Sequence, residues 1–226
     1  MQNSYKRIDA HLSSLGYCTR SEAKKFLRIF ELTVNDKRVF DTSIKAYHND
    51  IKVNNEVLDP EIITILLNKP SGFICSHNDA GSLIYALIPS RWNRRNPKIS
   101  TIGRLDVDTT GAIILTDDGA LNHKLSSPKS DVSKIYEATL AVPLNGDEKE
   151  IFASGELMLS GEKKPLLPAV LEVISETHVR LEICEGKYHQ VKRMFAAVGN
   201  RVLSLHRVSF GGFMVDDLKE GEYKFI

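Results

Sequence analysis

The 226-residue sequence has few cysteines, no long apolar run and almost no net charge. Its three cysteines, Cys18, Cys75 and Cys184, are odd in number and far apart, which argues against a disulfide framework and against a zinc site. No apolar run approaches the roughly 20 residues of a membrane-spanning helix, and the first residues lack the apolar segment of a signal peptide. We therefore expect a protein of the reducing cytoplasm with no membrane partner.

The net charge of +1 conceals an uneven distribution of charge along the chain. Residues 82–105 contain five basic and no acidic side chains, and residues 1–28 contain six basic and two acidic ones. Residues 137–177 reverse the balance, with eight acidic and three basic side chains. Such segments allow a near-neutral chain to bind a polyanion on one face. A basic cluster is also an ordinary feature of a solvated surface.

The first 55 or so residues are typical of a compact module of two helices and short strands. Apolar residues at helical spacing predict a helix over residues 5–15, which Gly16 ends. Thr19 and Glu22 form a capping-box pattern that begins a second helix, which continues to about residue 30. Short strands are expected at residues 32–34, 38–40 and 51–53.

This module resembles the S4 RNA-binding domain. The resemblance rests on Arg7-Ile8-Asp9, on residues 15–23 and on Val34-Asn35, although Asp36 stands where a glycine is usual. In that family the basic face of the two helices binds structured RNA. The resemblance implies that residues 1–58 form an RNA-binding domain. Its phosphate contacts would be Arg7, Arg20, Lys24, Lys25 and Arg28. The residues alone also fit a small α+β domain with a solvated basic helix.

Beyond the polar residues 59–61 the pattern becomes rich in strands. Strands are predicted at residues 62–67, 72–76, 111–116, 136–142, 169–174 and 178–183, and helices at 83–87, 120–125, 146–153 and 189–197. The two kinds of element alternate irregularly and are joined by hairpin-like connections. We therefore expect an α+β fold rather than a doubly wound sheet.

Residues 103–119 hold the strongest candidate for chemistry. Arg104, Asp106 and Asp108 lie in a turn bracketed by glycines, directly before an apolar strand. Loops supported by rigid strands are common positions for catalytic side chains. The residues alone leave three interpretations open for the carboxylates: a nucleophile, a metal ligand or a surface ion pair.

Two further segments carry residue types suited to catalysis. Lys134 and Tyr136 are at strand spacing, so both face the same side. Residues 185–195 predict a tight turn that begins a basic helix containing Lys192 and Arg193. Each segment also has an ordinary interpretation, a half-buried strand tyrosine in one case and a solvated basic face in the other.

Taken together, the three segments resemble the pseudouridine synthases, in particular the branch that modifies small-subunit ribosomal RNA. The resemblance includes residues 67–72, 205–207 and 211–212 and spans nearly the whole chain. It implies a larger catalytic domain over residues 59–226, with a mostly antiparallel mixed sheet flanked by helices. The partner it implies is ribosomal RNA or a small-subunit assembly intermediate, and we expect a monomer.

The resemblance assigns roles to matching positions. Asp106 corresponds to the nucleophile, and Arg104 helps to occupy the space left by the extruded base. Tyr136 stacks on the uracil and serves in proton transfer. Lys192 forms the ion pair that keeps Asp106 charged and oriented, with Arg193 as a second candidate. Many relatives have arginine where Lys192 stands, and lysine is a point charge without the bidentate geometry of arginine. Asp108 is interpreted as turn structure.

The chemistry of the reaction independently requires such residues. Uridine becomes pseudouridine when the N1–C1′ bond breaks, the base turns and C5 joins C1′. A carboxylate attacks either C1′ or C6, it must be ionised, and a nearby cation favours the ionised form. Extruding the base costs a few kcal/mol, of which stacking on an aromatic ring recovers a part. No external group is transferred, so we expect neither a cofactor nor a metal.

Two other functions fit part of the sequence. Residues 106–110 match the Asp-x-Asp-x-Thr pattern of haloacid-dehalogenase-like phosphatases, which bind Mg²⁺, but the apolar strand follows the pattern here instead of preceding it. The second is a non-catalytic RNA-binding or ribosome-assembly protein with the same fold. His123, His189 and His206 lack the spacing of metal ligands.

Overall fold

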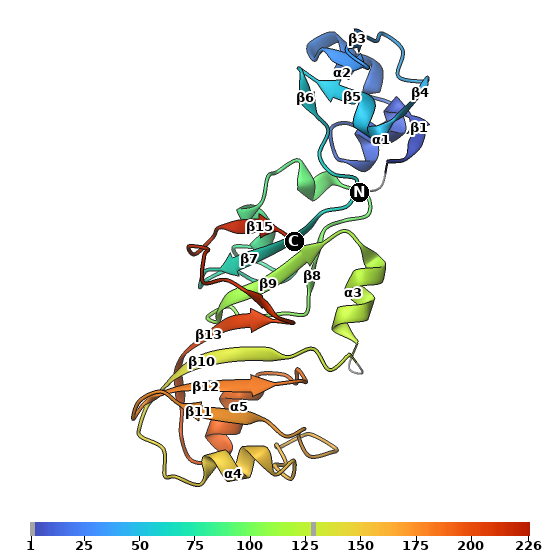
Figure 1. The fold of residues 1–226 in the computed structure, drawn as a ribbon. Helices are drawn as coiled ribbons and strands as arrows, with labels where there is room; N and C mark the ends of the chain where they lie inside the picture. The colour runs from blue at the N-terminus through green and yellow to red at the C-terminus, as the bar shows by residue number, and fades with distance from the viewer. Residues whose placement is uncertain (1–2, 128–129) are drawn as a thin grey trace. The chain divides into compact units, whose positions relative to one another are not determined.

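The computed structural model describes residues 3–127 and 130–226, which form two compact units (Figure 1). The first unit comprises the residues up to Thr64 together with Tyr85–Ser100 and Leu115–Asn122. The second comprises Ile65–Ile84, Thr101–Ile114 and the residues from His123 onward. Within the described ranges, no helix is long and apolar enough to cross a membrane.

The first unit begins with two short helices and two small antiparallel sheets. Its elements up to residue 57 are β1 (Tyr5–Arg7), α1 (Ile8–Ser14), α2 (Ala23–Ile29), β2 (Leu32–Val34), β3 (Lys37–Arg38), β4 (Lys45–Tyr47), the 3₁₀ helix η1 (His48–Asp50), β5 (Ile51–Val53) and β6 (Glu56–Val57). One sheet pairs β1 with β4, and the other has the order β3-β2-β5-β6. Ile8, Leu12 and Leu15 lie at helical spacing and are buried against Phe26 and Leu32.

The helices predicted in this unit exist with shorter bounds. Residues 5–7 pair with β4 as strand β1, so the first helix starts three residues later than its apolar spacing predicts. The capping hydrogen bonds form: Thr19 N–H donates to Glu22 Oε2 at 3.0 Å, and Glu22 N–H donates to Thr19 Oγ1 at 3.3 Å. The intervening residues remain a turn, and α2 begins at Ala23.

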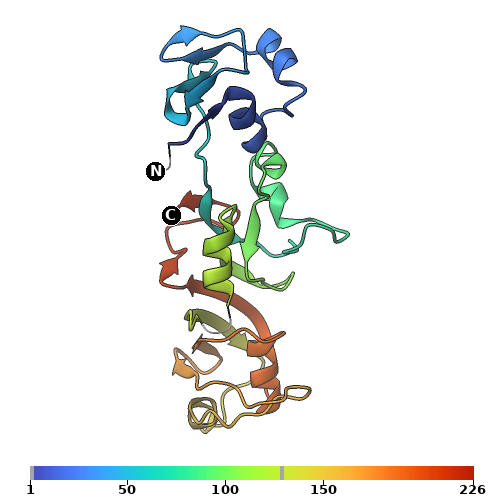
Figure 2. The same ribbon diagram turned by 90° about the vertical axis from the view of Figure 1, so that its right-hand side faces the viewer.

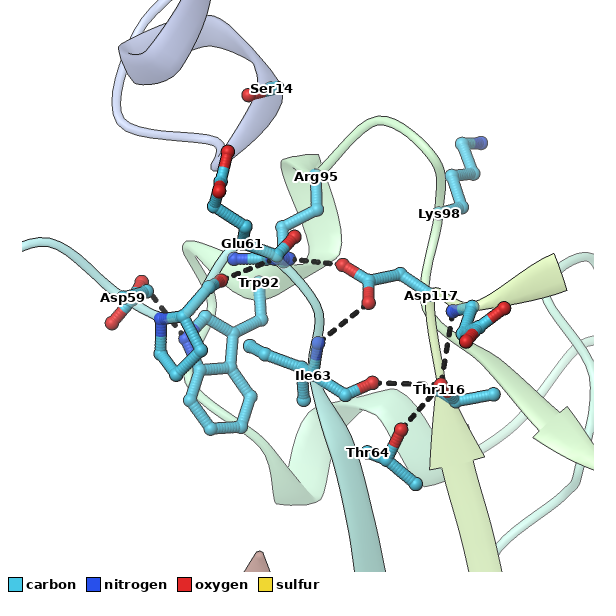
Figure 3. A network of polar contacts seen from close by, with 12 residues as sticks. Ser14, Asp59, Glu61, Ile63, Thr64, Trp92, Arg95, Lys98, Thr116 and Asp117 are labelled. Atoms are coloured by element: carbon cyan, nitrogen blue, oxygen red, sulfur yellow. Dashed lines mark hydrogen bonds and ion pairs between the residues drawn. The ribbon is translucent and has the colours of Figure 1, made fainter. Parts of the chain in front are cut away.

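A buried ion pair ties three segments of the first unit together (Figure 3). Arg95 Nε lies 2.7 Å from Asp117 Oδ2, and the two side chains are only 1% and 3% exposed. Asp117 also accepts the Ile63 N–H at 2.7 Å, and Arg95 Nη2 donates to the carbonyl oxygens of Pro60 and Glu61 at 2.8 and 2.9 Å. Both charges therefore have the additional hydrogen bonds that a buried pair requires.

Most of the second unit is one large sheet. The remaining elements of the chain are β7 (Thr64–Lys69), η2 (Ile84–Leu87), η3 (Trp92–Arg94), β8 (Ser100–Ile102), β9 (Thr110–Thr116), α3 (Gly119–Ser126), β10 (Lys134–Leu140), α4 (Glu148–Ala153), β11 (Val170–Val173), β12 (His178–Ile183), α5 (Gln190–Ala197), β13 (Val202–Phe210), β14 (Phe213–Met214) and β15 (Tyr223–Phe225). Among the described residues the strand order is β11-β12-β10-β13-β9-β7-β15, with β14 beside β13 and β8 beside β9. Figure 1 shows β9, β13, β10, β12 and β11 in this order down the picture.

The sheet has the mixed, mostly antiparallel arrangement that was expected. The pairs of β10 with β12 and β13, of β11 with β12 and of β7 with β15 are antiparallel, whereas β13 and β9 are parallel. Helix α5 contacts β13 and helix α4 contacts β11 (Figure 2). The α+β fold is confirmed, and the sheet is not the doubly wound parallel sheet that a phosphatase of the Asp-x-Asp-x-Thr type requires.

Gly111 makes the parallel pairing of β9 with β13 possible. It pairs with Arg207, its φ is +104°, and a Cβ atom on it would lie 2.2 Å from the Arg207 carbonyl oxygen. A larger residue would clash with the backbone of β13 and would also adopt a conformation that side chains disfavour. The glycine therefore holds the residues before β9 close to β13.

The strand predicted at residues 72–76 is wrong. Gly72 N–H donates to the Val107 carbonyl at 2.8 Å, and Ile74 N–H donates to Ser82 at 2.9 Å, so only an isolated bridge between Ile74 and Leu83 remains. The longest strand, Val202–Phe210, was not predicted. The predicted strands 32–34, 51–53 and 178–183 have the observed bounds.

The buried pair predicts a large loss of stability when one partner is removed. Asp117→Ala leaves the Arg95 guanidinium buried without a carboxylate, and we expect the free energy of unfolding of the first unit to fall by about 3–5 kcal/mol. Trp92, the single tryptophan, lies in this unit and is buried, so its fluorescence during urea unfolding measures the effect.

Lys52→Met is the control for this measurement. It removes an ion pair with Asp36 in the same unit, but those side chains are 34% and 79% exposed, so a change of at most about 1 kcal/mol is expected. Equal effects of the two variants would contradict a structural role for the buried pair.

Candidate active site

The loop before β9 is held in place by a buried lysine. Lys69 ends β7 and is fully buried, and its ammonium donates to the carbonyl oxygens of Pro70, Asp106, Val107 and Thr109 at 2.8–3.2 Å. Burial lowers the pKa of Lys69, and the four carbonyl oxygens replace the water that the ammonium loses. Three of these carbonyls belong to residues 106–109, so the lysine fixes the backbone that carries Asp106.

Helix α5 brings two side chains to Asp106. Lys192 Nζ lies 3.1 Å from Asp106 Oδ2, and His189 Nε2 lies 3.2 Å from Oδ1. His189 caps the helix in a left-handed conformation with φ 47°, and its ring stacks on Tyr188 at 3.8 Å between centroids. Each carboxylate oxygen of Asp106 therefore faces a different nitrogen group.

Lys192 pairs with a second carboxylate as well. Its Nζ lies 2.7 Å from Asp108 Oδ1, so Asp108 belongs to the charge cluster and is more than turn structure. Burial lowers the pKa of Lys192, but the hydrogen bonds to Asp108 and Asp106 together outweigh burial and raise it. The hydrogen bond from Lys192 in turn lowers the pKa of Asp108. Lys192 is therefore a cation, and Asp108 an anion, near neutral pH.

Arg193, the second candidate for the ion pair, lies elsewhere. Its Nη1 is 3.0 Å from Glu162 Oε1 and 2.9 Å from the Tyr188 carbonyl oxygen, and its Nη2 donates to the Ser160 carbonyl. It joins the loop around residue 160 to the start of α5. The structure thus gives the contact with Asp106 to Lys192.

Tyr136 lies on a buried arginine. Tyr136 is 8% exposed, and Arg207 Nη1 donates to its hydroxyl oxygen at 3.4 Å. Arg207 Nε donates to the Ala112 carbonyl at 2.6 Å, and its guanidinium lies 4.9 Å from the centre of the Phe210 ring. Arg207 Nη2 is buried and has no hydrogen-bond partner among the residues that the structure describes. This N–H group is available to an acceptor on a ligand.

Asp106, Tyr136, His189, Lys192 and Arg207 line one cavity of about 590 Å³ in the second unit. Arg104, which is exposed, also lines it. Among the described lining residues, six are basic (Arg104, Lys134, Lys164, Lys187, Lys192 and Arg207) and two are acidic (Asp106 and Glu185). The volume is within the range of about 300–1,000 Å³ for small-ligand sites. The excess of positive charge suits a ligand that carries phosphate.

The residues predicted to contact phosphate belong to the first unit and are all on its surface. Arg20, Lys24, Lys25 and Arg28 are exposed at or near α2. Arg7 is also exposed, but its Nη2 lies 2.6 Å from Asp9 Oδ2, so this charge is already paired.

Three members of the site were not assigned a role from the sequence. Lys69 and Arg207 lie in the matched segments 67–72 and 205–207, but nothing local shows that they are buried. A lysine at the end of an apolar strand is the signal that could have identified Lys69. His189 was part of a matched segment, and its contact with Asp106 depends on the left-handed turn.

Comparison with known proteins agrees with this geometry. The "Ribosomal small subunit pseudouridine synthase A" of Escherichia coli strain K12 is 49% identical over 225 residues, covering 96% of this chain and 95% of the relative. The protein of the same name from Pasteurella multocida is 42% identical over 224 residues, covering 96% and 94%. A crystal structure of a pseudouridylate synthase superimposes with a TM-score of 0.69 at 40% identity, covering 98% of this chain and 96% of the other.

The sequence pattern of the family described as "RNA pseudouridylate synthase" matches residues 63–197. That range contains Arg104, Asp106, Tyr136, His189 and Lys192, the residues that line the basic cavity. The resemblance found in the sequence is thereby confirmed, and the chain belongs to the RNA pseudouridylate synthases, enzymes that isomerise uridine in RNA.

Proposed function

We propose that this enzyme converts a specific uridine of small-subunit ribosomal RNA to pseudouridine. The observation that carries the proposal is the position of Asp106, whose two carboxylate oxygens face Lys192 and His189 in the wall of a basic cavity. The choice of RNA is supported by the names of the relatives, which are similar to this chain over almost their whole length.

Asp106 is the proposed nucleophile. Its carboxylate attacks C1′ of the ribose or C6 of the uracil; in either case the N1–C1′ bond breaks and a C5–C1′ bond forms. The proton on C5 is lost and N1 gains a proton, so the reaction needs no external reagent. Lys192, 3.1 Å from Asp106 Oδ2, holds the carboxylate in one orientation.

Tyr136 and Arg207 are proposed to receive the base. The aromatic ring offers a stacking surface for the uracil, and its hydroxyl group is the proposed group for proton transfer. Arg207 supports the ring through the 3.4 Å contact to this hydroxyl. The unpartnered Nη2 can donate to a carbonyl oxygen of the base, because a buried N–H gains most from an acceptor that has also left water.

Arg104 and the first unit are proposed to contact the RNA outside the target base. Arg104 is exposed at the cavity and fills the gap in the base stack after the uridine turns out. Residues 1–58 act as an S4-like RNA-binding domain, with residues 59–226 as the catalytic domain. The substrate is free ribosomal RNA or a small-subunit assembly intermediate in the cytoplasm, and the enzyme acts as a monomer.

Asp106→Asn tests the nucleophile. The amide has nearly the same shape but is a far weaker nucleophile, so we expect pseudouridine formation on small-subunit ribosomal RNA to fall by at least about 1,000-fold. Binding of the RNA should change by less than about 3-fold. Asp216→Asn, a change at an exposed aspartate in the same unit, is the control. Full activity of Asp106→Asn would overturn the assignment.

Lys192 variants test the ion pair. Lys192→Met removes the cation beside Asp106, and we expect kcat to fall by about 10- to 100-fold, the cost of a lost charged hydrogen bond. Lys192→Arg restores a cation and should recover most of this loss. Lys149→Met, at an exposed lysine of α4, is the matched control. Equal activities of Lys192→Met and the control would contradict the role.

A salt titration tests the RNA-binding face. Changing Arg20, Lys24, Lys25 and Arg28 to alanine removes up to four phosphate contacts, and each should reduce the slope of log affinity against log salt by about 0.7–0.9. The control changes Lys149 and Lys163, which are exposed in the second unit. If the slope is the same for both variants, residues 1–58 do not bind the RNA through this face.

A further inference from the structure

Two histidines and a glutamate form a buried cluster in the first unit. His11 lies in α1, His48 in η1 and Glu61 in the segment before β7. One ligand atom from each residue lies within 4.8 Å of those of the other two. His11 is fully buried, His48 is 6% exposed and the Glu61 side chain is 8% exposed. Three distant parts of the sequence thus bring metal-binding atoms together away from solvent.

The hydrogen bond of the His11 ring leaves a lone pair on its other nitrogen. His11 Nε2 lies 3.1 Å from the Ala46 carbonyl oxygen, which only accepts, so Nε2 carries the hydrogen and Nδ1 of the neutral ring carries the lone pair. The Nδ1 atoms of His11 and His48 are both buried, and neither has a hydrogen-bond partner within residues 3–127 and 130–226. Buried polar atoms rarely lack partners without a reason.

We propose that His11, His48 and Glu61 bind a divalent transition metal ion of the zinc type. Two imidazole nitrogens and one carboxylate oxygen are donors that zinc prefers, whereas calcium and magnesium prefer oxygen alone. Tetrahedral donors at bond lengths of about 2.0–2.1 Å lie about 3.4 Å apart, so ligand atoms that are up to 4.8 Å apart close by up to about 1.4 Å on binding.

Neighbouring residues orient the Glu61 carboxylate as the partners of a metal ligand usually do. Its carboxylate accepts hydrogen bonds from the backbone N–H and the hydroxyl of Ser4, the kind of contact that orients a metal ligand. Lys6 Nζ lies 3.4 Å from Glu61 Oε1, and its side chain is 35% exposed, so it can move into solvent when the metal takes its place. The other nearby cation, Arg95, is already paired with Asp117.

A cavity beside the cluster gives a metal ion a route in. It has a volume of about 540 Å³ and is lined by His48, Glu61 and the apolar side chains of Val57, Leu58 and Ile62. The space also admits a water molecule as the fourth ligand. A metal ion here would tie α1, η1 and the segment before β7 together and stabilise the first unit.

Zinc binding to the full-length enzyme tests the proposal. Chelator-treated protein is titrated with Zn²⁺ by calorimetry and in competition with a chromogenic chelator, and one tightly bound ion per chain is expected. His11→Gln and His48→Gln should each weaken binding at least about 10-fold, because each removes a ligand. His123→Gln, at an exposed histidine of the second unit, should bind like the unchanged enzyme.

Two further measurements separate loss of the site from loss of the fold. Trp92 fluorescence without metal shows whether each variant is folded, and Glu61→Gln provides a third variant of nearly the same shape as the original. Zn²⁺ should raise the unfolding temperature of the unchanged enzyme and of His123→Gln only. Absence of stoichiometric binding, or equal affinities in His11→Gln, His48→Gln and His123→Gln, would overturn the proposal. Isomerase activity is not part of the test, so its outcome is independent of the proposed function.

Discussion

The candidate active site depends on a lysine, Lys69, that does not line its cavity. The Lys69 ammonium is fully buried at the end of β7 and binds backbone carbonyl oxygens, three of them in residues 106–109. A buried ammonium without acceptors is very costly, so the loop carbonyls have to point toward it. The same carbonyls would otherwise face water and leave the loop free to move. The backbone that carries Asp106 is therefore tied to the end of β7.

The charged side chains of the site form a cluster in which one cation contacts two carboxylates. Lys192 serves both Asp106 and Asp108, and His189 contacts the second oxygen of Asp106. The compact ammonium reaches two carboxylates that a planar guanidinium would have to approach in one plane. Arg207 hydrogen-bonds to the Tyr136 hydroxyl, whereas Lys192 contacts Asp106. The aromatic ring and the Asp106 carboxylate are therefore held by separate cations. The lining of the cavity still carries an excess of positive charge.

Local signals predicted those elements that owe their structure to local causes. The apolar spacing of Ile8, Leu12 and Leu15 and the contacts between Thr19 and Glu22 located α1 and α2 to within a few residues. Local signals failed where pairing with a distant segment determines the secondary structure. Residues 5–7 are helical by spacing but pair with β4, and residues 72–76 have strand composition but bond to loops. The long strand β13 exists because β10, β9 and β14 lie beside it.

The sequence by itself determined the family and the α+β class, and it singled out Asp106 and Tyr136 as candidate site residues, because these depend on short motifs in a fixed order. Only the tertiary structure decided which cation meets Asp106. Lys192 and Arg193 are neighbours in sequence but point about 100° apart on a helix. The burial of Val191, Met194 and Phe195 fixes the rotation of α5, which turns Lys192 to Asp106 and Arg193 to Glu162. The contact between Lys192 and Asp106 thus depends on burial and on pairing between distant segments, which no short segment encodes.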